Sequence, residues 1–232
     1  MADNTGNGGR PANHARPPRR PLADQDRFGL LLVLLICTYV VSAFTKGRWT
    51  DGAQVVLYGA AAILSLRTSD VPKRYAGIIA AGLLAGTAIM VALALISRTG
   101  LGIANIWVAL VMLFVVCVIV YSVLSKDEVT IQSIYGAFSA YMILGLMFSS
   151  IFSAIDHLGG GHFFAHGEPA NTETFQYFSF TTLTTLGYGD FTAAGPPGRA
   201  IAVLEALTGQ VFLATLVARL VAAFRSPRQR AQ

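Results

Sequence analysis

A polar run near the C-terminal end of the chain, residues 181–190, has the residue types and spacing that could bind a cation. It reads Thr-Thr-Leu-Thr-Thr-Leu-Gly-Tyr-Gly-Asp. Gly187 and Gly189 alternate with bulkier residues, and glycine accepts backbone dihedral angles that are closed to residues with a Cβ. Such angles let a short backbone turn successive carbonyl groups toward one axis, where their oxygens can replace the water around a dehydrated cation. The Thr185 hydroxyl adds another oxygen just before the glycines.

The residues directly before this run predict a short helix over 173–184. Glu173 falls in its first turn, where a carboxylate complements the helix dipole, and the far end of the helix points at the glycine run. The partial negative charge at that end favours a cation. A simple glycine turn is the alternative. Span-length apolar segments on both sides favour the cation site.

The run Thr-x-Gly-Tyr-Gly-Asp at 185–190, with this helix and these apolar segments, resembles the signature of potassium channels. The resemblance implies that backbone carbonyls and the Thr185 hydroxyl line an ion path, while the side chains of Tyr188 and Asp190 face away from it. The ion-binding filter would then consist of Thr185, Leu186, Gly187, Tyr188 and Gly189.

Four residues are candidates for supporting the filter from outside the ion path: Asp190, Thr181, Thr184 and Glu205. Glu205 lies in a membrane span, where a carboxylate costs about 2.5–3.5 kcal/mol, so it needs a partner. We expect it to brace the filter from behind through threonine hydroxyls of the short helix. Many relatives carry an acidic residue where this chain has Thr181. Alternatives are a cavity-facing Glu205 that concentrates cations and a pairing with Arg199.

The span after the filter is predicted to be the inner helix of the pore, from about 199 to 224. Matching Gly198, Arg199 and Gly209 onto the potassium-channel pattern makes Gly209 resemble a gating hinge, with Gln210 and Leu213 toward the cavity. A close helix contact at Gly209 explains the glycine equally well.

The composition predicts an all-α membrane protein. Of the 232 residues, 54% are hydrophobic and only 12% are charged, which is too apolar for an ordinary soluble domain. A bilayer core of about 30 Å requires apolar runs of about 20 residues. Such runs lie near 28–45, 75–96, 101–124, 130–154 and 200–224, and the shorter run 52–66 is interpreted as one more span. We therefore expect six transmembrane helices, with a re-entrant pore helix and filter loop between spans five and six.

The chain divides into four predicted parts: a disordered basic tail (1–27), a four-helix membrane module (28–125), a pore module (126–225) and a short tail (226–232). The net charge of +5 reflects basic residues concentrated in both tails and in alternate loops, which predicts cytoplasmic termini rather than nucleic-acid binding. No signal peptide is expected, so the first span should remain as an anchor in the cell membrane. After Phe224 only a short run follows, and we expect no cytoplasmic ligand-binding domain.

Histidines and cysteines do not predict a metal site or an enzyme. Cys37 and Cys117 lie in apolar runs without metal-ligand spacing. Three of the four histidines fall in the glycine-rich segment 156–168, which we expect to be an external loop. A pH or metal sensor is conceivable there, as is a metal enzyme that also uses Asp156 and Glu168. No zinc-type spacing supports either, so we expect no cofactor and no metal beyond K⁺ in the filter.

One chain supplies one filter segment, and a closed ring of carbonyls needs four, so the resemblance implies a homotetramer surrounded by lipid. Its function would be passive, potassium-selective conduction. A weakly selective cation channel is the nearest alternative, although relatives of that kind usually alter the Gly-Tyr-Gly core. A potassium transporter subunit is another, but such proteins carry four pore repeats in one chain and this sequence has one.

The fourth apolar run, 101–124, contains no Lys or Arg, so it lacks the gating charges of a voltage sensor. Moving one charge across 100 mV contributes about 2.3 kcal/mol. We therefore expect conductance to vary only weakly when voltage is stepped across a bilayer containing the protein. A steep conductance curve equivalent to several moving charges would contradict this.

Overall fold

The computed structural model describes residues 27–44, 73–125 and 130–229, and every named element in these ranges is a helix. The predicted span 52–66, residues 1–26 of the predicted N-terminal tail and residues 230–232 of the predicted C-terminal tail lie outside the described residues. The helices are α1 (Arg27–Phe44), α3 (Lys73–Ile96), α4 (Arg98–Leu124), α5 (Ile131–Leu158), α6 (Thr172–Leu183) and α7 (Pro196–Gln229).

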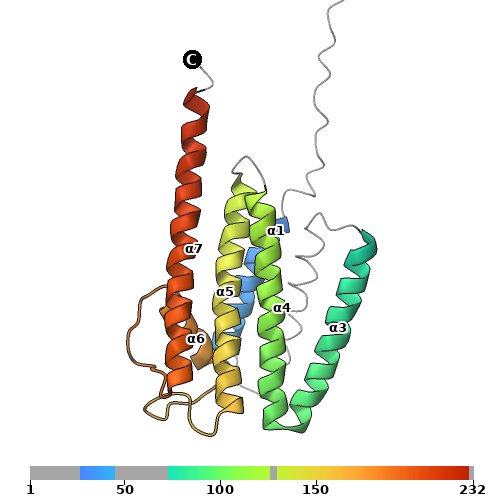
Figure 1. Ribbon diagram of the computed structural model, residues 1–232, viewed down its shortest axis with the longest axis vertical. Helices are drawn as coiled ribbons and strands as arrows, with labels where there is room; N and C mark the ends of the chain where they lie inside the picture. Colours follow the sequence, from blue (N-terminus) through green and yellow to red (C-terminus); the bar gives the residue numbers. More distant parts are fainter. Residues whose placement is uncertain (1–26, 45–72, 126–129, 230–232) are drawn as a thin grey trace, which may run out of the picture.

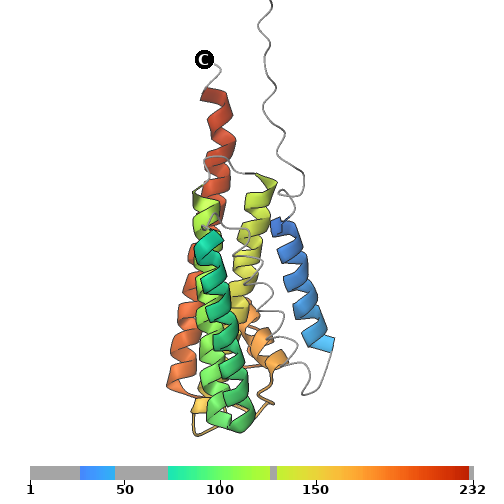
Figure 2. The same cartoon turned by 90° about the vertical axis from the view of Figure 1, so that its right-hand side faces the viewer.

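The long helices form a bundle around α5 (Figure 1). Helices α1 and α4 pack on α5, α3 packs on the outer side of α4, and the short α6 lies between α5 and α7. Figure 2 shows that α1 and α3 run in the same direction, so Phe44 and Lys73 lie at opposite ends of the bundle.

Three described helices are long and apolar enough to cross a membrane: Arg98–Leu124, Ile131–Leu158 and Pro196–Arg219. Two further apolar segments, Phe28–Val40 and Ala81–Ile96, are shorter. All five coincide with runs that the sequence marked as spans. Ser97 alone separates α3 from α4, and its hydroxyl caps α4 by accepting the Gly100 N–H at 2.9 Å.

Two helices extend beyond their predicted ends. Helix α5 continues to Leu158, so Asp156 and His157 belong to its last turn rather than to the following loop. Helix α7 begins at Pro196 and continues to Gln229, beyond both ends of the predicted range 199–224. Proline fits the first turn of a helix because the N–H that it lacks has no intrahelical partner there.

An aromatic cluster fixes the segment between α5 and α6. Five rings pack together, with neighbouring ring centroids 4.9–5.8 Å apart: Phe163 and Phe164 of this segment, Phe152 of α5, and Phe175 and Phe178 of α6. Burying large rings against one another contributes more than most core contacts. The cluster therefore determines where α6 begins relative to α5.

Candidate functional site

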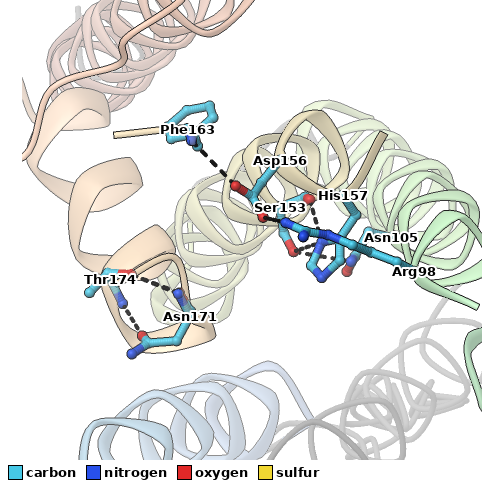
Figure 3. A network of polar contacts seen from close by, with 8 residues as sticks. All are labelled: Arg98, Asn105, Ser153, Asp156, His157, Phe163, Asn171 and Thr174. Carbon is cyan, nitrogen blue, oxygen red and sulfur yellow. Dashed lines mark hydrogen bonds and ion pairs between the residues drawn. The ribbon is translucent and has the colours of Figure 1, made fainter. Parts of the chain in front are cut away.

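Helix α6 starts at a reciprocal cap. The N–H of Thr174 donates to Asn171 Oδ1 at 2.9 Å, and the N–H of Asn171 donates to Thr174 Oγ1 at 3.1 Å (Figure 3). Glu173 occupies the first turn, where its negative charge interacts favourably with the positive end of the helix dipole. The helix predicted over 173–184 is observed at Thr172–Leu183, and its C-terminal end leads into the glycine run.

The first residues after α6 turn their N–H groups back onto the helix. Thr185 donates to the Thr182 carbonyl at 2.9 Å, and both Leu186 and Gly187 donate to the Thr181 carbonyl, at 2.8 and 3.1 Å. These bonds satisfy carbonyls that a helix C-terminus leaves without intrahelical partners. They also fix which way the following backbone leaves the helix.

The backbone of 185–189 alternates in handedness. Thr185, Gly187 and Gly189 have positive φ values of 58°, 52° and 82°, whereas Leu186 and Tyr188 between them do not. Alternating left- and right-handed dihedral angles turn successive carbonyls to one side of the chain. Within the described residues, no group donates a hydrogen bond to the carbonyls of 185–189. Their oxygens remain available to a ligand.

The side chains of Tyr188 and Asp190 lie against α6. Asp190 Oδ2 accepts a hydrogen bond from the Tyr177 hydroxyl at 2.8 Å, and the rings of Tyr177 and Tyr188 stack with centroids 6.5 Å apart. The hydrogen bond to the Asp190 carboxylate raises the pKa of Tyr177 to about 12, so the phenol stays protonated and keeps donating.

Thr181 and Thr184 contact residues 185–189, the predicted filter segment, differently from our expectation. Their hydroxyls donate to carbonyls of their own helix, Thr181 to Phe178 at 3.0 Å and Thr184 to Phe180 at 2.7 Å. Thr181 reaches the filter segment only through its backbone carbonyl, described above.

Glu205 is fully buried and faces α6, but neither its expected donors nor Arg199 bonds to it. The Arg199 Nε donates to the Ala193 carbonyl at 2.9 Å instead. Glu205 Oε1 lies 2.5 Å from Ser179 Oγ, in the middle of α6. The predicted pairing with threonine hydroxyls is therefore wrong, and so is the alternative pairing with Arg199.

Gly209 forms a close contact with the end of α6. A Cβ at this position would lie 2.2 Å from the Leu183 carbonyl oxygen. The next residue, Gln210, donates through Nε2 to Thr185 Oγ1 at 3.1 Å, which links α7 to the first residue of the filter segment. Leu213, one turn further along α7, is half-buried. The close contact explains this glycine, while a hinge at Gly209 stays a prediction.

A polar network crosses the end of α5 at some distance from the filter segment (Figure 3). The buried Asp156 accepts from Arg98 Nη2 of α4 at 3.2 Å and from the Phe163 N–H at 3.3 Å. His157 Nδ1 donates to the Ser153 carbonyl at 2.7 Å. Among the described residues, no three His, Cys, Asp or Glu side chains gather as metal ligands would.

Sequence reasoning missed several residues that hold this site, among them Ser179, Tyr177, Gly145 and Asn171. The N-terminal cap of α6 could have been predicted from the sequence, since Asn171 and Thr174 have the spacing of a capping box. Ser179 and Gly145 had none, because their roles depend on which helices become neighbours.

Residues 140–226 match a family model described as an ion channel. The matched segment runs from α5 to α7 and is similar to ion-channel domains, and this similarity together with the long apolar helices supports a membrane protein. Comparison with curated proteins and with solved structures finds no match.

We expect Gly209→Ala to lower the thermal unfolding midpoint in detergent. The added Cβ meets a backbone oxygen that cannot rotate away, and overpacking of this kind costs about 1–3 kcal/mol. Gly82→Ala in α3 is the control, because its Cβ meets nothing within 4 Å and alanine favours a helix by about 1 kcal/mol. A midpoint for Gly209→Ala as high as that of the control would contradict the close contact and favour a free hinge.

Proposed function

We propose that this protein is a potassium-selective channel in which the carbonyls of Thr185, Leu186, Gly187 and Tyr188 from four copies surround the permeating ion. The observation that carries the proposal is the alternating φ of 185–189, together with carbonyls that accept no hydrogen bond within the described residues. Closely spaced carbonyl oxygens replace the hydration shell of K⁺ in filters of this kind. The C-terminal dipole of α6 adds negative potential behind them.

The surface of α7 supports assembly from several copies. Large apolar side chains along this helix remain 49–65% exposed in a single chain, namely Val203, Leu204, Leu207, Val211, Val217 and Val221. In a membrane such side chains face lipid or another protein surface. A second copy of the pore segment would cover part of them and bring the next filter segment to the same axis.

Six crossings remain part of this proposal. Helices α1 and α3 run in the same direction, so the end of α1 and the start of α3 lie at opposite ends of the bundle, which supports one more crossing between them (Figure 2). With α6 as a re-entrant helix and basic tails inside, both termini would face the cytoplasm.

Gly187→Ala should abolish potassium flux into liposomes that hold the purified protein. Its φ of 52° suits glycine, and a Cβ in the left-handed region costs about 1–2 kcal/mol in each copy, which shifts the carbonyl direction. Gly160→Ala is the matched control, since this loop glycine has open space around it and no positive φ.

Unchanged flux in Gly187→Ala would contradict the assigned filter. In the same liposomes, equal permeation of sodium and potassium by the wild type would favour the weakly selective channel instead.

The purified protein should be a tetramer, because carbonyls from a single chain cannot surround an ion. Native mass spectrometry in detergent should give four copies of the 24.7 kDa chain. A monomer or dimer that still conducts after reconstitution would overturn the shared pore.

A further inference from the structure

A buried contact joins three helices of the pore segment behind the filter. Glu205 of α7 and Ser179 of α6 both expose none of their surface. Ser179 Oγ lies 2.5 Å from Glu205 Oε1 and 2.6 Å from the backbone carbonyl oxygen of Gly145 in α5. The serine hydroxyl therefore lies between two oxygen atoms at hydrogen-bonding distance.

The number of protons available at this contact bears on whether Glu205 is protonated. A serine hydroxyl carries one proton, and a backbone carbonyl can only accept. If Glu205 were a carboxylate, both neighbours of Ser179 Oγ would be acceptors competing for that proton. One of the two short oxygen–oxygen contacts would then hold no proton and would be repulsive. A protonated Glu205 removes the conflict by donating to Ser179 Oγ, while Ser179 donates to Gly145.

The surroundings of the second carboxyl oxygen agree with a neutral acid. Glu205 Oε2 is buried and has no hydrogen-bond partner among the described residues. The ion pair observed in the described part of the chain joins Arg98 to Asp156, so it provides no cation for Glu205. Tyr141 of α5 is close enough to interact electrostatically with Glu205, but its hydroxyl donates to the Leu183 carbonyl at 3.2 Å. A buried unpaired carboxylate costs far more than a neutral acid with one free carbonyl oxygen.

We propose that Glu205 is a neutral carboxylic acid that donates a hydrogen bond to Ser179 and acts as a positioning residue for the filter. The relay runs from Glu205 through Ser179 to the Gly145 carbonyl and ties α7, α6 and α5 together. Gly209, one turn after Glu205, contacts the Leu183 carbonyl, so α7 holds α6 at two levels. Its effect on the filter rests on the proposed channel function, whereas the protonation state does not.

Infrared difference spectroscopy of the purified protein at neutral pH tests the protonation state without any ion flux. The difference spectrum of the wild type minus the Glu205→Gln variant should show the carbonyl band of a protonated carboxyl group. The Ser179→Ala variant should shift that band, because the acid loses its acceptor, and Ser179→Thr should leave it in place. A carboxylate band in the difference spectrum, or an acid band that Ser179→Ala does not move, overturns the proposal.

Potassium flux in liposomes tests the positioning role. Glutamine keeps the shape of the acid and donates an N–H to Ser179, so Glu205→Gln should conduct within about twofold of the wild type. Glu205→Leu removes the donor and should lose at least about tenfold, as expected for a buried hydrogen bond left incomplete. A Glu205→Gln flux as low as that of Glu205→Leu would mean that the charge matters, and it would overturn the neutral relay. If the wild type itself carries no potassium flux, the channel proposal fails while the infrared result still decides the state of Glu205.

Discussion

The structure depends on keeping a row of backbone carbonyls free of hydrogen bonds while fixing the backbone that carries them. A segment whose backbone makes no hydrogen bonds would normally be disordered, because nothing offsets the conformational entropy lost when it is ordered. Here the N–H groups of Thr185, Leu186 and Gly187 are bound to the last turn of α6, whereas the carbonyls of 185–189 accept nothing within the described residues. The donors hold the segment, and the acceptors remain available to an ion.

The position of residues 185–189 therefore depends on the position of α6, and α6 is too short to be stable alone. Its neighbours hold it on different sides. The aromatic cluster and the Asn171 cap set its start, Tyr141 of α5 donates to the Leu183 carbonyl at its end, and α7 contacts it at Ser179 and Leu183. The Tyr177–Asp190 hydrogen bond then anchors the residues that leave the filter segment.

Much of this could be predicted from local patterns. Apolar runs located the five described long helices, and Glu173 with the glycine run located α6, because these signals lie within a few residues of the features that they predict. The partner of Glu205 could not be predicted. A carboxyl group in a membrane span needs a partner, and the threonines near the end of α6 were plausible donors. The way α7 packs on α6 brings Glu205 to Ser179 instead. Asp156 was likewise predicted to lie in a loop, because its contacts with Arg98 and Phe163 are not visible in the sequence. Helix α5 continues about one turn past its predicted end and includes Asp156.

The most direct test of the central claim is an experimental structure of the protein in lipid with K⁺. We expect four copies around one axis, with ions between the carbonyls of Thr185, Leu186, Gly187 and Tyr188 and with the C-terminal end of α6 pointing at them. Carbonyls of this segment that point away from a shared axis, or that are bonded to a neighbouring chain, would contradict it.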